Sequence, residues 1–254
     1  MKLTSKFSKH LTRNEILVPY LNNYFATANW PDNWQFTVHP NKEKDDAFHP
    51  SSALMCLKAL WFKMEGYEFP EELKDFGQQK NFLFGHFYHT TLQWIMVEGL
   101  GFATWDDIEK EFDFHLETPK GNPYRVRGFV DIAKCVIPNT DPFLVDIKTM
   151  NARIYAQSPT PDFWVEKFEA QVRMYLDFTG LDKAVVLLVE KDSPHRFKEL
   201  VIERDDLFVD QIVEGWESVV DARAEGIIPD CTCWDPGKCP VKDYDTKTTT
   251  IAQA

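Results

Sequence analysis

The sequence contains no apolar run long enough to cross a membrane. No stretch of about 18 consecutive apolar residues, the length that marks a membrane-spanning helix, occurs in the chain of 254 residues. The basic start of the chain, MKLTSKFSKHLTRNEIL, is likewise not followed by the apolar stretch of a secretory signal peptide. These two absences argue against a membrane protein and predict a cytoplasmic location.

The chain also has fewer positively charged than negatively charged residues. The chain has 28 Lys and Arg against 40 Asp and Glu, which gives a formal net charge of -12. This argues against a protein that coats nucleic acid through general basicity. An enzyme with a local basic channel and an acidic metal site remains possible, because pockets that hold divalent cations carry negative charge.

Cysteine is scarce, and no segment of the chain is repeated. Five cysteines in a reducing compartment do not make the disulfide framework of a small secreted domain. The hydrophobic fraction is 44% and includes 20 Phe and 8 Trp, so a sizeable core can form. We expect an N-terminal helical and irregular segment over residues 1–50, one folded domain over 51–240 and a flexible tail over 241–254.

Four segments have the apolar spacing of amphipathic helices: residues 51–66, 78–97, 159–180 and 204–226. Ser51 or Ser52 can cap the first helix, and Gly66 can end it. Thr160 can cap the third helix. Gly85, inside the second helix, costs about 1 kcal/mol relative to Ala, which indicates close packing at that point.

Five further segments have the composition of β-strands: residues 111–117, 124–137, 142–150, 184–190 and 198–203. The first alternates strictly, with Phe112, Phe114 and Leu116 on one side. The fourth, AVVLLVE, is a continuous apolar run typical of a strand buried on both faces. Helices before, between and after these strands predict an α/β fold with a central mixed sheet flanked by helices.

An acid and a lysine, Asp146 and Lys148, interrupt the otherwise apolar strand PFLVDIKTM. Residues two apart share one face of a strand, so these side chains point one way while Val145 and Ile147 point the other. A turn in the segment PNTDP places Asp131 opposite Lys148 in an antiparallel ladder, with Asp146 as its diagonal neighbour. The three charged side chains are then expected to converge on one face of the sheet.

Two carboxylates and a lysine on one sheet face suit metal-assisted hydrolysis of a phosphodiester. Oxygen ligands select Mg²⁺ or Mn²⁺. The ion polarises the scissile phosphate and activates a bound water, and the lysine orients that water or stabilises charge in the transition state. The alternative is an exposed strand face with an ordinary salt bridge, because Asp-x-Lys alone is common by chance.

The stretch GFVDIAKCVIPNTDPFLVDIKT resembles the core of the PD-(D/E)xK nuclease superfamily, which has an acid on one strand and an acid-x-lysine on the next. Asp131, Asp146 and Lys148 match these positions one by one. The resemblance implies a restriction-endonuclease-like core, with a central mixed β-sheet flanked by helices, and a catalytic role for these three residues.

The chain on either side resembles the RecB-type and Cas4-type subgroup of that superfamily. GHFYH supplies its Gly-x-x-x-His pattern as Gly85 and His89. The resemblance implies that His89, Asp131, Asp146 and the carbonyl of Ile147 hold the Mg²⁺ or Mn²⁺ ion. Taken alone, His89 could equally be a packed helix histidine.

The same subgroup has Gln-x-x-x-Tyr on the helix that follows the lysine strand. AQVRMY supplies this pair as Gln171 and Tyr175. The two residues are four apart and share one helix face. We expect that face to look towards the substrate or the catalytic lysine, whereas the pair alone would be read as helix surface.

Four cysteines complete the resemblance, now to Cas4-type nucleases and the AddB nuclease domain: Cys56, Cys231, Cys233 and Cys239. It implies that they hold a 4Fe–4S cluster joining an N-terminal helix to the C-terminal segment. The chain departs from the usual pattern, because CTC is one residue shorter than Cys-x-x-Cys and Leu57 replaces a proline. Zinc is the rival occupant, and unligated thiols are a further alternative. Cys135 is expected in the core.

The resemblance implies an exonuclease that acts on DNA, single-stranded or with a free end, in a prokaryotic cell or a virus-infected host cell. The alternative is a non-catalytic or weakly catalytic DNA-end-binding component of a recombination, repair or CRISPR-adaptation assembly. A structural zinc protein is a third hypothesis, and a homo-oligomer is possible. Candidate DNA contacts are the basic residues Arg125, Arg127, Lys134, Arg153 and Lys167 and the aromatic residues Trp61, Phe84 and Tyr155.

Overall fold

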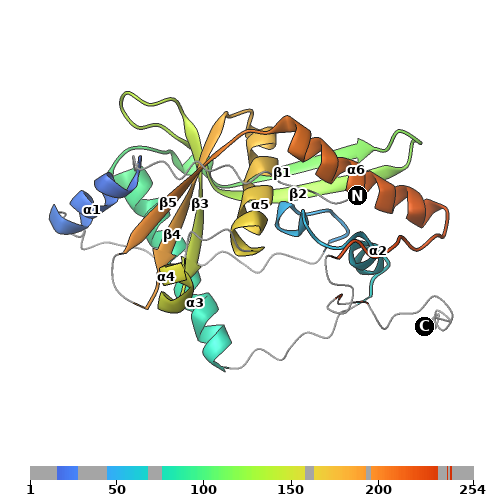
Figure 1. The fold of residues 1–254 in the computed structure, drawn as a ribbon. Helices are drawn as coiled ribbons and strands as arrows, with labels where there is room; N and C mark the ends of the chain where they lie inside the picture. Colours follow the sequence, from blue (N-terminus) through green and yellow to red (C-terminus); the bar gives the residue numbers. More distant parts are fainter. Residues whose placement is uncertain are drawn as a thin grey trace.

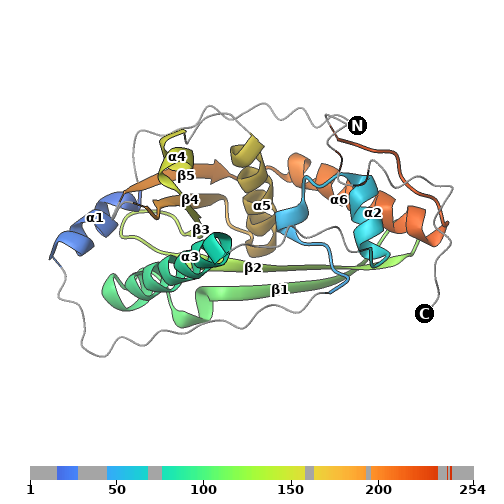
Figure 2. The ribbon, with the colours of Figure 1, turned by 90° about the horizontal axis from the view of Figure 1, so that it is seen from below.

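The computed structural model describes residues 16–27, 45–67, 76–157, 163–192, 196–233, 239 and 241. Its centre is a five-stranded mixed sheet in the order β1-β2-β3-β4-β5, with helices on both faces (Figures 1 and 2). The predicted α/β fold with a central mixed sheet is thereby confirmed. The strands are β1 (Ile108–Glu117), β2 (Pro123–Cys135), β3 (Phe143–Met150), β4 (Lys183–Glu190) and β5 (Phe197–Glu203).

Helices form two layers over this sheet. Buried residues of α1 and the end of α3 pack on one face, and those of α4 and α5 pack on the other. Helices α2 and α6 lie side by side beyond α5 (Figure 2). The helices are α1 (Val18–Thr27), α2 (Leu57–Met64), α3 (Phe76–Trp94), α4 (Ala152–Gln157), α5 (Phe163–Thr179) and α6 (Asp206–Ala224), with short turns η1 (Pro50–Ser52), η2 (Ile95–Gly99) and η3 (Trp105–Asp107).

The strand pairing combines hairpins with one crossover. The pairs β1–β2, β2–β3 and β4–β5 are antiparallel, whereas β3 and β4 are parallel. Parallel neighbours need a connection that returns over the sheet, and α4 and α5 provide it. Strand β4 lies between β3 and β5 and is buried along Ala184–Glu190, as its apolar run predicts.

The register of β2 against β3 differs from the predicted one. Ile132 pairs with Val145, and an irregularity separates this pair from Cys135–Phe143. Continued by one residue, this register places Asp131 opposite Asp146, so the predicted pairing with Lys148 was wrong by two residues. A shift of two residues keeps every side chain on its face. Val145 and Ile147 accordingly lie in the core, 0% and 1% exposed.

Helix α2 starts later than predicted. Ser51 and Ser52 belong to the 3₁₀ turn η1, and Cys56 holds the N-cap position of a helix that begins at Leu57. The cause lies just upstream, where the backbone of Phe48 pairs with β2: its N–H donates to the carbonyl of Arg125 at 2.8 Å. The chain has to leave that pairing through a turn before a helix can form.

Gly85 of α3 confirms the prediction of close packing. A Cβ added there would lie 3.1 Å from Thr149 Oγ1 of β3, a tight contact, so glycine favours the close approach of the helix to the sheet. The predicted cap Thr160 and nearly all of the predicted tail lie outside the described residues. No helix in the described part of the chain is long and apolar enough to span a membrane.

Candidate active site

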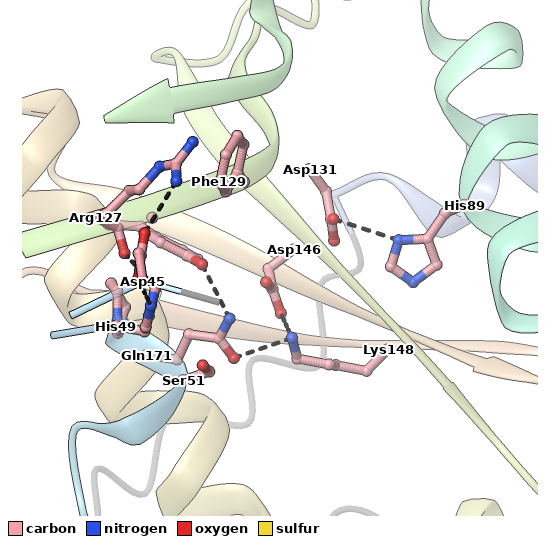
Figure 3. Close-up of a pocket in the computed structure, with 13 residues that line it drawn as sticks. Asp45, His49, Ser51, His89, Arg127, Phe129, Asp131, Asp146, Lys148 and Gln171 are labelled. Atoms are coloured by element: carbon pink, nitrogen blue, oxygen red, sulfur yellow. Dashed lines mark hydrogen bonds and ion pairs between the residues drawn. The ribbon is translucent and has the colours of Figure 1, made fainter. Parts of the chain in front are cut away.

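A cavity of about 230 Å³ opens between β2, β3, α5 and the segment that leads into η1 (Figure 3). Every side chain that the sequence assigned to hydrolysis lines it. The lining residues are Asp45, His49, Pro50, Ser51, His89, Arg127, Gly128, Phe129, Asp131, Asp146, Lys148, Gln171 and Tyr175.

Two carboxylates form the centre of the cavity (Figure 3). Asp131 Oδ2 accepts a hydrogen bond from the backbone N–H of Ile147 at 2.6 Å. Asp146 is 2% exposed. Burial raises the pKa of Asp146 to about 6, and the charge of Asp131 adds to the rise while Lys148 opposes it. Burial also acts against the charged form of Asp131, but His89, Lys148 and the Ile147 N–H together hold its pKa below the usual value.

Lys148 connects the carboxylates to helix α5. Its Nζ lies 2.7 Å from Asp146 Oδ2 and donates a hydrogen bond of 3.1 Å to Gln171 Oε1. Gln171 Nε2 in turn donates to the hydroxyl of Tyr175 at 3.0 Å. Burial lowers the pKa of Lys148, but the carboxylates of Asp146 and Asp131 outweigh it, so the net shift is upward and the side chain is an ammonium. The structure therefore joins Asp-x-Lys and Gln-x-x-x-Tyr in one hydrogen-bonded chain.

His89 approaches from the opposite side, on α3. Its Nδ1 lies 3.3 Å from Asp131 Oδ1 (Figure 3). Burial lowers the pKa of His89, and Asp131 raises it further than burial lowers it. His89 lies one turn beyond Gly85, whose close contact with β3 lets α3 bring the imidazole to the carboxylate.

Nitrogen and carboxylate donors gather around Asp131. Ligand atoms of His89, Glu109 and Asp131 all lie within 4.8 Å of one another. Asp146 lines the same cavity on the side of Lys148. This donor set, one imidazole with carboxylate oxygens, fits a divalent cation such as Mn²⁺ or Mg²⁺.

Sequence reasoning missed the segment that forms the opposite wall of the cavity. Asp45 Oδ2 lies 2.9 Å from an Arg127 guanidinium nitrogen, and its Oδ1 lies 2.8 Å from His49 Nε2. His49 Nδ1 also lies 2.9 Å from the carbonyl oxygen of Arg127. No local pattern in NKEKDDAFHP predicts that Asp45 and His49 line the cavity, because their position depends on the pairing of Phe48 with β2.

The candidate DNA contacts separate into distinct environments. Arg127 lines the cavity and pairs with Asp45 and Glu111, whereas Arg125 on the same strand is bound to Asp113 outside the cavity. Phe84 is 46% exposed on α3. Tyr155 is 4% exposed within the core beside α5, so the suggestion that it stacks on unpaired bases was wrong. Trp61 packs against the cysteine cluster instead of the cavity.

The four predicted cysteines form a second cluster, away from the cavity. Cys56 Sγ lies 3.7 Å from Cys231 Sγ and 3.9 Å from Cys239 Sγ, and all four sulfurs lie within 4.8 Å of one another. Burial disfavours the thiolate of Cys56, but hydrogen bonds from Ala59, Thr232 and the neighbouring thiols bring its pKa down to about 6.

This gathering can hold a metal and joins the start of α2 to the chain after α6, the link that the resemblance implied. Cys135 is separate from it and fully buried in the main core, as expected.

The protein is similar to known proteins in its fold and not in its sequence. The sequence matches no protein-family model and no curated protein. The structure is similar to that of SSO0001, with a TM-score of 0.50 and 15% identity over 83% of this chain and 91% of that one.

Two exonuclease structures show weaker similarity. A phage-related exonuclease from Haemophilus somnus 129PT has a TM-score of 0.41 and 14% identity, over 71% of this chain and 96% of that one. The alkaline exonuclease LHK-Exo from Laribacter hongkongensis has a TM-score of 0.40 and 16% identity, over 71% of this chain and 89% of that one. At such identities a likeness describes the fold, and chemistry has to be argued from the site itself.

Proposed function

We propose that this protein is a metal-dependent deoxyribonuclease that hydrolyses phosphodiester bonds, acting as a single-strand-preferring exonuclease of the Cas4 type. One observation carries the proposal. The ammonium of Lys148 lies between Asp146 and Gln171 in the same cavity where Asp131 meets His89. A surface salt bridge does not need a carboxylate as buried as that of Asp146, so its burial has a cost in stability that a purely structural role would not explain.

In this proposal His89, Asp131, Asp146 and the carbonyl of Ile147 hold Mg²⁺ or Mn²⁺. When bound, the ion polarises the scissile phosphate and lowers the pKa of a coordinated water. The carboxylates of Asp131, partly buried, and Asp146, almost fully buried, line one cavity and support this role, because a cation relieves the repulsion between them.

Lys148 serves the attacking water and the transition state. Its raised pKa keeps it protonated, so it acts as a hydrogen-bond donor and a fixed positive charge and not as a base. Gln171 holds the ammonium in place, and the Tyr175 hydroxyl accepts from Gln171 and so fixes the orientation of its amide. Burial raises the pKa of Tyr175, which keeps the phenol neutral.

We expect DNA to contact the cavity through Arg127 and the neighbouring ring of Phe129. Arg127 lines the cavity next to Phe129, with its guanidinium carbon 5.2 Å from the ring centroid. Guanidinium groups bind phosphate oxygens, and aromatic rings stack on unpaired bases. Phe84 and Phe87 on α3 are 46% and 42% exposed and offer further rings for a single strand.

The test is digestion of end-labelled single-stranded DNA in Mn²⁺ by the wild type and by Lys148→Ala. We expect the variant to lose activity by about 100-fold or more, the usual cost of removing one group that stabilises the transition state. Lys120→Ala is the matched control, because Lys120 lies at the β1–β2 turn and pairs with Glu225 on the surface. Equal activity of wild type and Lys148→Ala would refute the assignment.

The same assay distinguishes the alternative function, which is DNA-end binding without cleavage. Retention of labelled DNA by the wild type, with no product in either Mg²⁺ or Mn²⁺, would favour a binding component of a repair, recombination or CRISPR-adaptation assembly. Products from a circular single strand would in turn argue against an exonuclease and for internal cleavage.

A further inference from the structure

We infer that Glu109 is an additional protein ligand of the active-site cation, together with His89 and Asp131. The inference rests on the proposed function, since it concerns the same metal site. No sequence pattern pointed to Glu109. It precedes the segment that the sequence predicts as the first strand, and β1 in the structure begins one residue before it, at Ile108.

Strand pairing sets Glu109 beside Asp131. Ile108 pairs with Ile132 and Lys110 pairs with Val130, so Glu109 faces Asp131 across the β1–β2 ladder. Residues directly opposite in an antiparallel pair share a face, and like charges in such positions are destabilising. A cation between the two carboxylates removes this repulsion, and the His89 imidazole stands within 4.8 Å to complete the set.

Hydrogen bonding and charge support the same conclusion. The side chain of Gln93, 1% exposed, donates to Glu109 Oε1 at 2.9 Å and to the Asp131 carbonyl at 3.2 Å. A buried amide that orients a ligand carboxylate is a usual companion of metal sites.

Asp146, almost fully buried, faces the same cavity, and its Oδ2 has only the ion pair with Lys148 among the described residues. Asp131 and Asp146 act on the Lys148 ammonium, and Glu109 adds a third carboxylate beside Asp131, so a divalent cation would offset the negative charge gathered there.

The backbone at Glu109 is consistent with a position selected for its side chain. Its φ of 46° lies in the left-handed region, which is costly for a residue other than glycine. This backbone conformation occurs at the residue whose carboxylate lies within 4.8 Å of a ligand atom of Asp131.

Mn²⁺ binding to the full chain tests this inference. We expect Glu109→Gln to weaken Mn²⁺ affinity by about 10-fold or more, measured by electron paramagnetic resonance of free Mn²⁺, since even residues that only orient ligands cost this much. The Mn²⁺-induced rise in Tm should shrink in parallel. Glu117→Gln is the control, because Glu117 is an exposed carboxylate at the far end of β1.

The two failures are distinguishable. Mn²⁺ binding by the wild type with unchanged affinity in Glu109→Gln would overturn the role of Glu109 and leave the proposed function standing. No Mn²⁺ binding by the wild type would overturn the metal site itself. Because the affinity and the Tm shift are compared within each variant, a lower basal stability of Glu109→Gln does not obscure the result.

An independent observation carries a second inference, on the occupant of the cysteine cluster. The geometry points to a single Zn²⁺. Four thiolates around zinc, with Zn–S bonds of about 2.3 Å, form a tetrahedron whose sulfurs are separated by about 3.8 Å. The sulfur separations from Cys56 are 3.7 Å to Cys231 and 3.9 Å to Cys239. In a 4Fe–4S cluster each thiolate binds a different iron, so the whole cube separates the sulfurs further.

Anaerobic purification of the full chain, followed by metal analysis and a visible spectrum, decides between the two. We expect a colourless protein with about one zinc per chain, which Cys231→Ser loses and a matched Ser218→Ala variant on α6 retains. A brown protein with about four irons and four acid-labile sulfides per chain would overturn the zinc assignment and establish the iron–sulfur cluster instead.

Discussion

Lys148 is the residue on which the interactions of the cavity converge. A buried ammonium is stable only when its charge and its hydrogen bonds are satisfied. Asp146 provides the opposite charge and Gln171 provides a neutral acceptor. Asp146 lies on strand β3 and Gln171 lies on helix α5. The position of the ammonium therefore depends on how α5 packs on the sheet.

Gln171→Leu removes the neutral partner of Lys148 while keeping the size of the side chain. We expect cleavage of single-stranded DNA in Mn²⁺ to fall about 10- to 100-fold in kcat, which corresponds to the loss of one hydrogen bond to a charged group. Gln171→Glu retains an acceptor and should recover most of the rate. A leucine variant as fast as the wild type would show that Gln171 does not position the lysine.

Arg127 and Arg125 form a natural pair for testing substrate recognition. They lie two residues apart on β2, but only Arg127 lines the cavity. We expect Arg127→Gln to raise KM for DNA with little change in kcat, and to reduce the salt dependence of binding by about one phosphate contact. Arg125→Gln, measured by the same salt titration, should leave both unchanged. Equal effects of the two substitutions would point to general electrostatics and not to a contact in the cavity.

At the scale of elements, the cavity depends on three close approaches. Helix α3 reaches β3 at Gly85, the η1 turn reaches β2 at Gly128, and α5 reaches the same glycine through Tyr175. Glycine at these two points leaves room where another side chain would separate the elements. The shape of the cavity therefore depends on these two glycines as well as on the charged side chains.

Gly128→Ala tests this packing. The added Cβ would lie 3.0 Å from Tyr175 Cε1 and 3.1 Å from Pro50 Cγ, and neither ring can bend away. We expect the free energy of unfolding in urea to fall by about 1–3 kcal/mol, as for other overpacked sites. The control is Gly215→Ala in α6, where the nearest atom is Leu57 Cδ2 at 3.4 Å. It should be neutral or stabilising by up to about 1 kcal/mol, because alanine is the better helix former.

At the scale of the whole molecule, the cysteine cluster links segments far apart in the sequence. Cys56 is the N-cap residue of helix α2, and Cys231 follows the end of α6. The contact between their sulfurs therefore joins residues that are 175 positions apart in the sequence. Cross-links that close long loops stabilise mainly by restricting the unfolded chain. The cluster is separate from the cavity, and we therefore expect its role to be structural.

Removal of the bound metal should therefore act on stability before it acts on chemistry. We expect a chelator, or Cys231→Ser, to lower the free energy of unfolding by about 2 kcal/mol or more, and to lower Tm accordingly. In buffer free of Mg²⁺ and Mn²⁺, chelator added to Cys231→Ser should cause no further change in Tm. An unchanged Tm in the wild type after complete metal removal would contradict a structural role.

Much of this arrangement follows from the sequence alone. The helices and strands are predictable because their patterns are local, with a period of two for β1 and a continuous apolar run for β4. The family resemblance also implied a common site for His89, Asp131, Asp146, Lys148, Gln171 and Tyr175, and all six line one cavity.

Tertiary structure alone decided the register of β2 on β3, the wall formed by Asp45 and His49, and the position of Glu109 beside Asp131. Each depends on backbone pairing between segments distant in the chain, or on a bulge and a left-handed residue within a strand. Such pairing is set by the packing of the complete sheet, and no local pattern of residue types encodes it.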